Sequence, residues 1–427
     1  ENAPYTPAAS VLGVAACVAI GLLPLSSTPV QVLVACIFLF ENQVTTVDLL
    51  TEAIWAERLQ ATPSLGPDIL TFVYAGNQAA CLVAVLASGF AIEYLGAQPT
   101  FLLIAALACA VLCPLALGYT DESPLTREAT AQLRRKFWEQ REACALAGVM
   151  LACAACICVS GLLSSDPAVN AAVAVVAACT VLATFSLALS PVIAKFAAFS
   201  LIQTSMSLSV HGPAFYFLTD TPEEYPEGPH FSTVFFNSVL GAVGGLCSLL
   251  GFYTYHSFSA KISYRSLLVT SNIALSLLHL CDVLLFSRAN LRLGLPDHLF
   301  VLGGAVVGPV IAQWQWMPQV ALFSSLCPED MEATMFALVV GCHNLGVGVA
   351  ASTGSLLLRA LSCNPKGDVG DGEQLKNLWI ASGIASILPM FSVVLLFRLV
   401  PEGRQGERVE GSLDATAGSL WERLMQA

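Results

Sequence analysis

Two neighbouring polar residues lie deep inside an apolar stretch of this sequence. His343 and Asn344 follow Glu332 by about 11 residues within the apolar run 332–361. At ~1.5 Å rise per residue of a helix, they lie roughly 16 Å into that run. If the run crosses a bilayer, polar groups at this depth cost free energy unless they line a cavity or find partners, so they are candidates for a binding site. The alternative is that neighbouring helices satisfy both side chains.

Further acids, amides and imidazoles lie in other apolar runs. Asp48 and Glu52 are four residues apart, which places them on one face of a helix. Amides and acids beside aromatic rings suit a planar, polar heterocycle, because rings stack on it and amides meet its donors and acceptors. The candidates for a substrate or ion pathway are Asp48, Glu52, Asn77, Gln203, His211, Asp282, Gln313, Glu332, His343 and Asn344. For Asp48, Glu52 and Glu332 the alternative is a role as interfacial caps, or as gate pairs with Arg58 or another cytoplasmic base.

Several other kinds of chemistry are disfavoured. No His-Glu-x-x-His, Gly-x-Ser-x-Gly or P-loop pattern occurs, so we expect neither an enzyme nor a bound cofactor. The triplet Cys153, Cys156 and Cys158 has no nearby histidine or carboxylate, which favours small packing residues over a metal site. A net charge of −12 without a basic patch argues against a nucleic-acid partner.

The composition is that of a membrane protein. Of the 427 residues, 56% are hydrophobic and only 11% are charged, against about 25% charged in a soluble domain. The apolar runs are too long for barrel strands, so the spans should be helices in a lipid bilayer. In the tenth span, Pro309 and Pro318 should loosen the hydrogen-bond ladder. The predicted spans are 8–25, 30–50, 68–95, 99–119, 143–163, 168–190, 195–218, 232–255, 264–287, 297–323, 332–361 and 374–399.

The distribution of basic residues predicts the orientation. If the connector 120–142 is cytoplasmic, strict alternation places thirteen of the 18 Lys and Arg residues on the inner side. This excess follows the positive-inside rule. The tail 400–427 should then be cytoplasmic, and the acidic, proline-containing loop 219–231 should form a stiff lip outside.

Two segments carry a resemblance to a known family. The pattern MPxVxLxxxLCPxxMEATMxALxxGxxNLG begins at Met317, and HGPAFYFLTDTPEEYPEGPHFSTVFFNSVLG covers residues 211–241. The first resembles the penultimate helices of the folate–biopterin transporter family, a branch of the major facilitator superfamily. The second is similar to the kinetoplastid pteridine and folate transporters of that family.

The resemblance implies an all-α, polytopic, two-bundle fold with an extra helical hairpin between the bundles. The chain would then lack the first two helices of the family. The implied parts are a partial N-terminal bundle (1–120), a cytoplasmic connector (121–142), an inserted transmembrane hairpin (143–194), a C-terminal six-helix bundle (195–399) and a cytoplasmic tail (400–427). The hairpin has no deep charged residue, so we expect it to pack outside the bundles and not to line the pathway.

The implied function is transport of folate or biopterin by alternating access. Proton coupling through Asp48 or His343 is one option for its energy source. A monomer in the plasma membrane is expected, with a small molecule as the only soluble partner. Two alternatives stay open: a transporter of another metabolite such as S-adenosylmethionine, and a membrane sensor or scaffold that transports nothing. Asn344 matches the family pattern, so we expect it to face the substrate. We expect His343 to turn towards a neighbouring helix, and Asp48 to contact the substrate from the opposite bundle.

Overall fold

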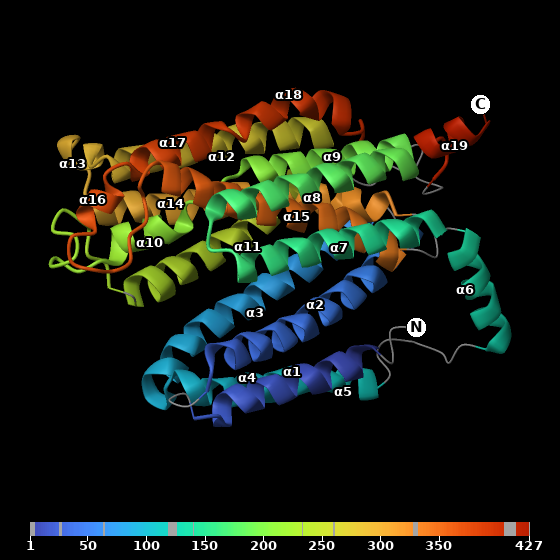
Figure 1. The fold of residues 1–427 in the computed structure, drawn as a ribbon, viewed down its shortest axis with the longest axis horizontal. Coiled ribbons are helices and arrows are strands. Elements are labelled where there is room, and N and C mark those ends of the chain that lie inside the picture. Colours follow the sequence, from blue (N-terminus) through green and yellow to red (C-terminus); the bar gives the residue numbers. More distant parts are fainter. Residues whose placement is uncertain are drawn as a thin grey trace. The chain divides into compact units, whose positions relative to one another are not determined.

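The computed structural model shows a helical protein (Figure 1). It describes residues 5–24, 28–62, 65–117, 126–139, 141–232, 234–258, 261–327, 332–404 and 416–426. Over these residues it contains no β-strand. The first helices are α1 (Tyr5–Leu22), α2 (Val30–Ala61), α3 (Gly66–Leu95), α4 (Ala97–Ala110), α5 (Leu112–Ala116) and α6 (Arg127–Glu139). The next are α7 (Arg141–Leu163), α8 (Pro167–Ala188), α9 (Pro191–Met206), α10 (His211–Thr219), the π-helix η2 (Phe235–Val239), α11 (Leu240–Phe258) and α12 (Tyr264–Phe286). The last are α13 (Ala289–Arg292), α14 (Asp297–Ser325), α15 (Glu332–Ala360), α16 (Gly372–Leu375), α17 (Leu378–Ile387), α18 (Met390–Leu399) and α19 (Leu420–Gln426).

The predicted number of membrane spans is confirmed. Within the described residues, 12 helical spans are long and apolar enough to cross a membrane. Most of their ends lie within a few residues of the predicted ones; the fifth, for example, runs over Arg141–Leu163. Hydropathy locates such spans well because every backbone polar group in a bilayer must be satisfied within the helix itself. The chain is an all-α, multi-pass integral membrane protein.

Residues 1–58 and 83–141 form one compact unit. In it, α1 packs along α4. Gly13 of α1 lies so close to α2 that a Cβ atom there would be 2.6 Å from the Cβ of Gln43. Gln43 is buried, and its amide donates to the Ala108 carbonyl at 3.4 Å. Gln98 in α4 donates to the Ile20 carbonyl at 3.1 Å. Side-chain amides therefore join the helices of this smaller unit through backbone carbonyls.

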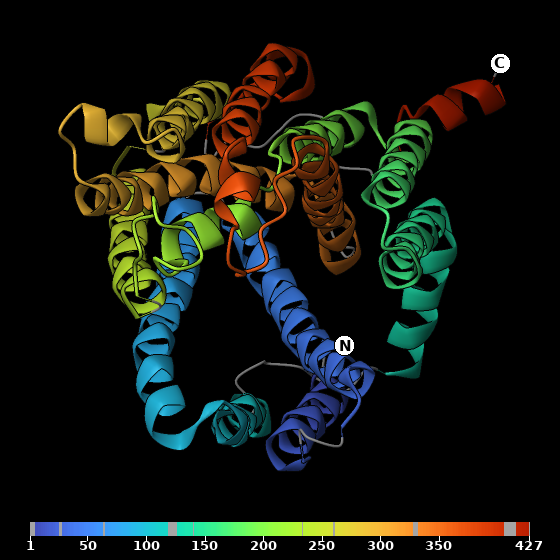
Figure 2. The same cartoon turned by 60° about the vertical axis from the view of Figure 1, so that its left-hand side comes forward.

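Residues 59–82 and 142–427 form the second and larger unit. Its long helices run along a common direction in Figure 1, and the turned view of Figure 2 shows how they pack side by side. The main pairs are α9 with α15, α11 with α14, and α12 with both α14 and α17. The hairpin of α7 and α8 belongs to this unit, and α8 packs against α15. Aromatic rings fill the interior: Phe323 lies between Phe196 and Phe336, with centroid distances of 5.3 and 6.3 Å.

Two membrane spans of the larger unit are interrupted, and neither is the tenth, for which the prolines predicted a loosened hydrogen-bond ladder. Despite Pro309 and Pro318, α14 is one continuous helix. The seventh span instead breaks into α9 and α10, and the twelfth divides into α16, α17 and α18. The break in the seventh span, residues 207–210, begins about 16 residues from the start of α9, or roughly 24 Å along the span. Irregular backbone at such a depth is tolerated only where it is covered by protein or lines a cavity.

Residues 219–231 and 361–373 pack together into a small structure, here called the cap. Asp371 accepts hydrogen bonds from the backbone N–H groups of Lys366 and Gly367, both at 2.6 Å, and of Asp368 at 3.2 Å. Tyr225 inserts among buried apolar side chains that include Phe217, whose ring centroid is 5.5 Å away. The two loops are therefore one ordered element.

Candidate substrate site

Three amide side chains meet inside the larger unit. The Oδ1 atom of Asn272 in α12 accepts a hydrogen bond from Gln203 of α9 at 2.7 Å and another from Gln315 of α14 at 2.8 Å. The Asn272 amide nitrogen donates to the Leu268 carbonyl at 2.6 Å. Gln203 and Asn272 are almost completely buried, at 3% and 1% exposure. Because burying an unpaired amide costs free energy, this shared arrangement joins the three helices at one point.

The amide cluster leaves acceptor atoms unused. The Oε1 atoms of Gln203 and Gln319 are buried and have no hydrogen-bond partner among the described residues. Gln319 lies one turn after Gln315 and donates to its carbonyl at 3.1 Å. A buried acceptor without a partner is costly. The cluster therefore keeps two buried acceptors that no described residue satisfies.

A cavity of about 160 Å³ opens at this cluster. Both interrupted spans contribute to its wall, together with α12 and α14. It is lined by Ser207, Leu208, Val210, His211, Asn272, Leu275, Ser276, His279, Gln315, Ser382, Ala385, Ser386 and Pro389. Hydroxyl, amide and imidazole groups thus surround a space in the membrane-spanning part of the protein, and a planar polar molecule could hydrogen-bond to several helices at once.

Close packing against α15 holds the break in place. The backbone N–H of Ser209 donates to the Ala350 carbonyl of α15 at 3.3 Å. At Gly354, a Cβ atom would collide with the Ser209 carbonyl and lie 2.9 Å from its nitrogen. At Gly346, a Cβ atom would lie 2.8 Å from both the Leu201 carbonyl and Thr204. The two glycines let α9 and the break approach α15 backbone to backbone.

His343 is fixed between α9 and α14. Its Nδ1 atom lies 3.1 Å from the Thr204 hydroxyl and 3.5 Å from that of Ser200, and its ring centroid is 4.8 Å from that of Trp316. Thr204 donates its own hydroxyl proton to the Ser200 carbonyl at 2.8 Å. Nδ1 of His343 and the Thr204 hydroxyl are therefore joined by a hydrogen bond whose donor is set by the tautomer of the imidazole. Asn344, one residue further, is exposed.

Only part of the predicted set meets at the cavity. Gln203 belongs to the amide cluster and His211 lines the cavity. Gln313 lies elsewhere, because its side chain packs 3.0 Å from the Cβ position of Gly251 on α11. Asp282 lies on α12, half-buried and outside the cavity lining.

The other predicted residues lie on other elements. Asn77 is an exposed residue of α3. Asp48 and Glu52 lie on α2 of the smaller unit, and their participation in a shared site with Asn344 stays a prediction. The side chain of Glu332 and residues 328–331 are outside the described part of the chain.

Asn272 was missed in the sequence. The sequence does contain a signal for it, because Asn272 is an amide near the middle of the ninth span. A polar side chain at that depth costs free energy, so every such residue is a candidate for a functional site. The predicted candidate on the same helix was Asp282, and the predicted candidate on α14 was Gln313, whereas the structure places the amide of Gln315 in the cluster.

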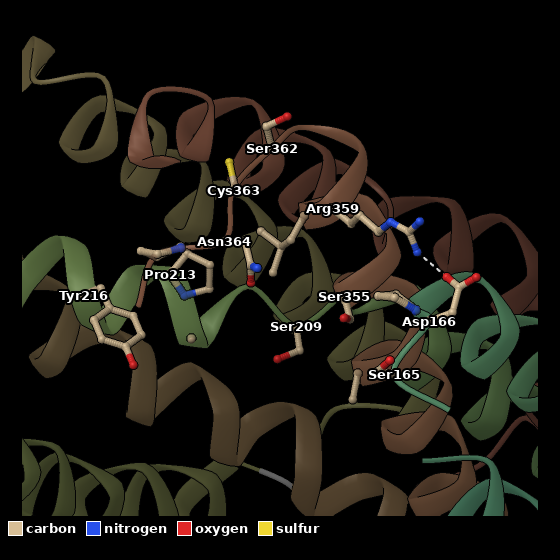
Figure 3. A pocket seen from close by; sticks show the side chains of 15 residues that line it. Ser165, Asp166, Ser209, Pro213, Tyr216, Ser355, Arg359, Ser362, Cys363 and Asn364 are labelled. Atoms are coloured by element: carbon tan, nitrogen blue, oxygen red, sulfur yellow. Dashed lines mark hydrogen bonds and ion pairs between the residues drawn. The ribbon is translucent and has the colours of Figure 1, made fainter. Parts of the chain in front are cut away.

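A second concavity, here called the outer groove, lies on the other side of the same break. Its volume is about 840 Å³. The tip of the α7–α8 hairpin contributes to it, although the hairpin was expected to lie away from any pathway. Figure 3 shows the side chains that point into it. It is lined by Ser165, Asp166, Pro167, Ser209, Gly212, Pro213, Tyr216, Ala351, Ser355, Leu358, Arg359, Ser362, Cys363, Asn364 and Pro365.

Comparison with known sequences identifies the family. The sequence profile of the BT1 family matches residues 1–417 of the 427. The chain belongs to the BT1 family. This confirms the family resemblance seen in the two sequence patterns.

Named relatives come from plants and cyanobacteria. Probable folate-biopterin transporter 6 of Arabidopsis thaliana is 26% identical over 94% of this chain and 69% of its own length. Probable folate-biopterin transporter 2 of the same plant is 31% identical over 48% of this chain and 38% of its own length. The Folate-biopterin transporter of Synechocystis is 31% identical over 35% of this chain and 29% of its own length. The chain thus spans less than half of two of these relatives and about two thirds of the third.

Proposed function

We propose that this BT1-family protein is a membrane transporter of pteridines, carrying folate, biopterin or both by alternating access, and is not an enzyme. The observation that supports this most directly is the amide-lined cavity at the meeting point of two interrupted spans. Transporters commonly place substrate where discontinuous helices expose backbone and polar side chains near the bilayer midplane. The names of the relatives point to the same solutes.

The cavity chemistry suits the pterin ring. A pterin presents an amino group and ring N–H groups beside a carbonyl and ring nitrogens on one planar edge. The hydroxyls of Ser382 and Ser386 line the cavity and can either donate to or accept from this edge. Asn272 then acts as the fixed centre of the site, because its oxygen already holds two amides.

The size of the cavity requires a movement on binding. At about 160 Å³, it is smaller than the ~300–1,000 Å³ usual for small-molecule sites. The segment most suited to move is α10, a short helix separated from α9 by the non-helical residues 207–210. Its displacement would enlarge the cavity without disturbing the packing of α9 on α15.

Three finer proposals accompany transport. His343 is a candidate for coupling to protons, because an imidazole can both take up and release a proton; Asp48 is a second candidate. A plasma-membrane location and a monomeric, lipid-embedded state are proposed from the family resemblance.

The test is uptake of labelled biopterin, folate and S-adenosylmethionine by cells that lack their own carriers and express this chain. Biopterin or folate uptake above that of empty cells is the expected result. Uptake of S-adenosylmethionine alone would replace the pteridine assignment with the other solute. No uptake of any of the three, with normal amounts of protein in the membrane, would favour a sensor or scaffold.

A further inference from the structure

The outer groove has the chemistry of a binding site in its own right. Its two charged lining residues, Asp166 and Arg359, form an ion pair at one end, and Tyr216 presents its ring at the other end (Figure 3). Between them lie the polar side chains of Ser209, Ser355 and Asn364. A site with an aromatic end, a cationic end and hydrogen-bonding groups between them is complementary to an elongated aromatic acid.

We infer that the outer groove binds a small ligand that carries both an aromatic ring and a carboxylate, with Arg359 as the partner of the carboxylate. A guanidinium group offers several N–H donors in a planar fork that matches a carboxylate. In the structure, Arg359 uses Nη1 for Asp166, while 56% of its side-chain surface remains exposed. Its position at the end of α15 places the charge at the rim of the groove.

Asp166 occupies the carboxylate position in the empty groove. It is held there as the N-cap of α8, because it accepts a hydrogen bond from the Ala168 N–H at 3.0 Å. This hydrogen bond, and then the one from Arg359, keep the pKa of Asp166 below its usual range, so it is ionised at neutral pH. Since exposed ion pairs add little to stability, Arg359 can exchange Asp166 for a ligand carboxylate at small cost. Asp166 is therefore a built-in competitor of the ligand.

The groove and the amide cavity share a wall. Ser209 lines the outer groove, whereas its neighbours Leu208 and Val210 line the amide cavity. A ligand in the groove therefore contacts the break about which α10 would move when the cavity enlarges. In one respect the inference rests on the proposed function: the aminobenzoyl-glutamate tail of a folate is an aromatic acid of this kind, whereas biopterin has no carboxylate for Arg359.

The test measures binding of p-aminobenzoylglutamate, which has the ring and carboxylates but no pterin, to the full chain in detergent by isothermal titration calorimetry. Arg359→Gln should weaken binding about tenfold, as expected for loss of ~1.4 kcal/mol. Asp166→Asn keeps a good N-cap residue but removes the competitor, so it should tighten binding by up to about fivefold. Arg292→Gln, the same change at an exposed residue outside the groove lining, is the control and should leave binding unchanged.

The proposal predicts opposite changes in probe affinity for Arg359→Gln and Asp166→Asn. If the ion pair were purely structural, removing either partner would change the affinity in the same direction. Equal weakening by both substitutions, or no binding of the probe by the parent, would overturn it. Biopterin uptake by the parent and by the control Arg292→Gln is measured alongside and should be the same in both. If the parent takes up neither biopterin nor folate, the proposed transport function is refuted but the groove proposal is not. Calorimetry measures binding of the probe whether or not the protein transports anything.

Discussion

At the scale of single residues, the amide cluster of Asn272, Gln203 and Gln315 organises the candidate substrate site. Asn272 satisfies Gln203 and Gln315 through one oxygen atom, so its removal leaves the buried amide of Gln203 and the half-buried amide of Gln315 without this acceptor. Each such buried, unsatisfied group costs roughly 1–3 kcal/mol. The cluster therefore contributes both to stability and to the geometry of the cavity.

Asn272→Leu tests this role. We expect a lower melting temperature and a biopterin uptake KM raised about tenfold or more, because the amides of Gln203 and Gln315 lose the acceptor that positions them. Melting is followed by tryptophan fluorescence in detergent, and uptake is normalised to the amount of protein in the membrane. Gln132→Leu, a change at an exposed amide of α6 outside the membrane spans, is the control and should change neither quantity. A parent-like KM for Asn272→Leu would place the substrate elsewhere.

The neighbours His343 and Asn344 should behave differently. His343→Ala removes a ring packed on Trp316 and bonded to Thr204, so it should lower the melting temperature and change how uptake depends on pH. Asn344→Ala changes an exposed side chain, so the melting temperature should stay the same. If Asn344 contacts substrate, its replacement should still raise the uptake KM about tenfold. Unchanged uptake by Asn344→Ala would remove it from the pathway.

At the scale of elements, the seventh span is shaped by its contact with α15. Gly346 and Gly354 allow the backbone of α9 and of the break to lie directly against that helix. Side chains at these positions would have to push the two elements apart. The break is thus a consequence of packing between two spans, together with the short α10 that follows it.

Gly354→Ala should disturb this contact. The new methyl group would collide with the Ser209 carbonyl, and overpacking of this kind costs about 1–3 kcal/mol. We expect a lower melting temperature and reduced uptake. Gly348→Ala is the matched control on the same helix, because a Cβ atom at Gly348 meets nothing within 4 Å. Similar effects of the two substitutions would mean that helix propensity, not contact with the break, matters here.

The cap should respond to pH through Asp220. Burial, and then the nearby carboxylates of Glu224 and Asp371, raise the pKa of Asp220 to about 6, while His230 acts in the opposite direction. The pKa of Asp220 in the folded protein lies above the ordinary value of 3.8. The contribution of protonated Asp220 to the free energy of unfolding is therefore complete below about pH 4 and is lost as pH rises through about 6.

Hydrogen exchange of residues 219–231 is the measurement for this prediction. Protection should fall between about pH 5 and pH 7 in the parent, after correction for intrinsic exchange rates. Asp220→Asn should abolish that fall and increase protection at pH 7. The same pH dependence in both proteins would show that another group titrates in the cap.

At the scale of the whole molecule, the basic residues predict the orientation of all spans. The tail and residues 120–142 should be cytoplasmic, and the cap should face outward. An epitope tag inserted after the exposed Glu223 should be reached by antibody in intact cells. A tag after Gly403 should be reached only after permeabilisation. Protection of the tag at Glu223 would reverse the orientation.

The sequence alone determined the class of protein, the membrane spans and the family. These follow from local properties. The length of an apolar run identifies a membrane span without knowledge of its tertiary contacts, and the family patterns that begin at Met317 and His211 are contiguous in the chain. It also pointed to Gln203 and His211, because polar residues are conspicuous in apolar helices. The smooth hydropathy of α14 gave no sign that its prolines would be accommodated within a continuous helix.

Tertiary structure decided which polar residues meet. Adjacent residues of a helix point about 100° apart, so only the packing of neighbouring helices determines that Gln315 joins Asn272 while Gln313 packs against Gly251. The same holds for the pairing of Asp166 with Arg359, which are 193 residues apart in the chain. Hydropathy is a property of a segment and survives without its neighbours, whereas a binding site is a set of distances between segments and exists only after they have packed.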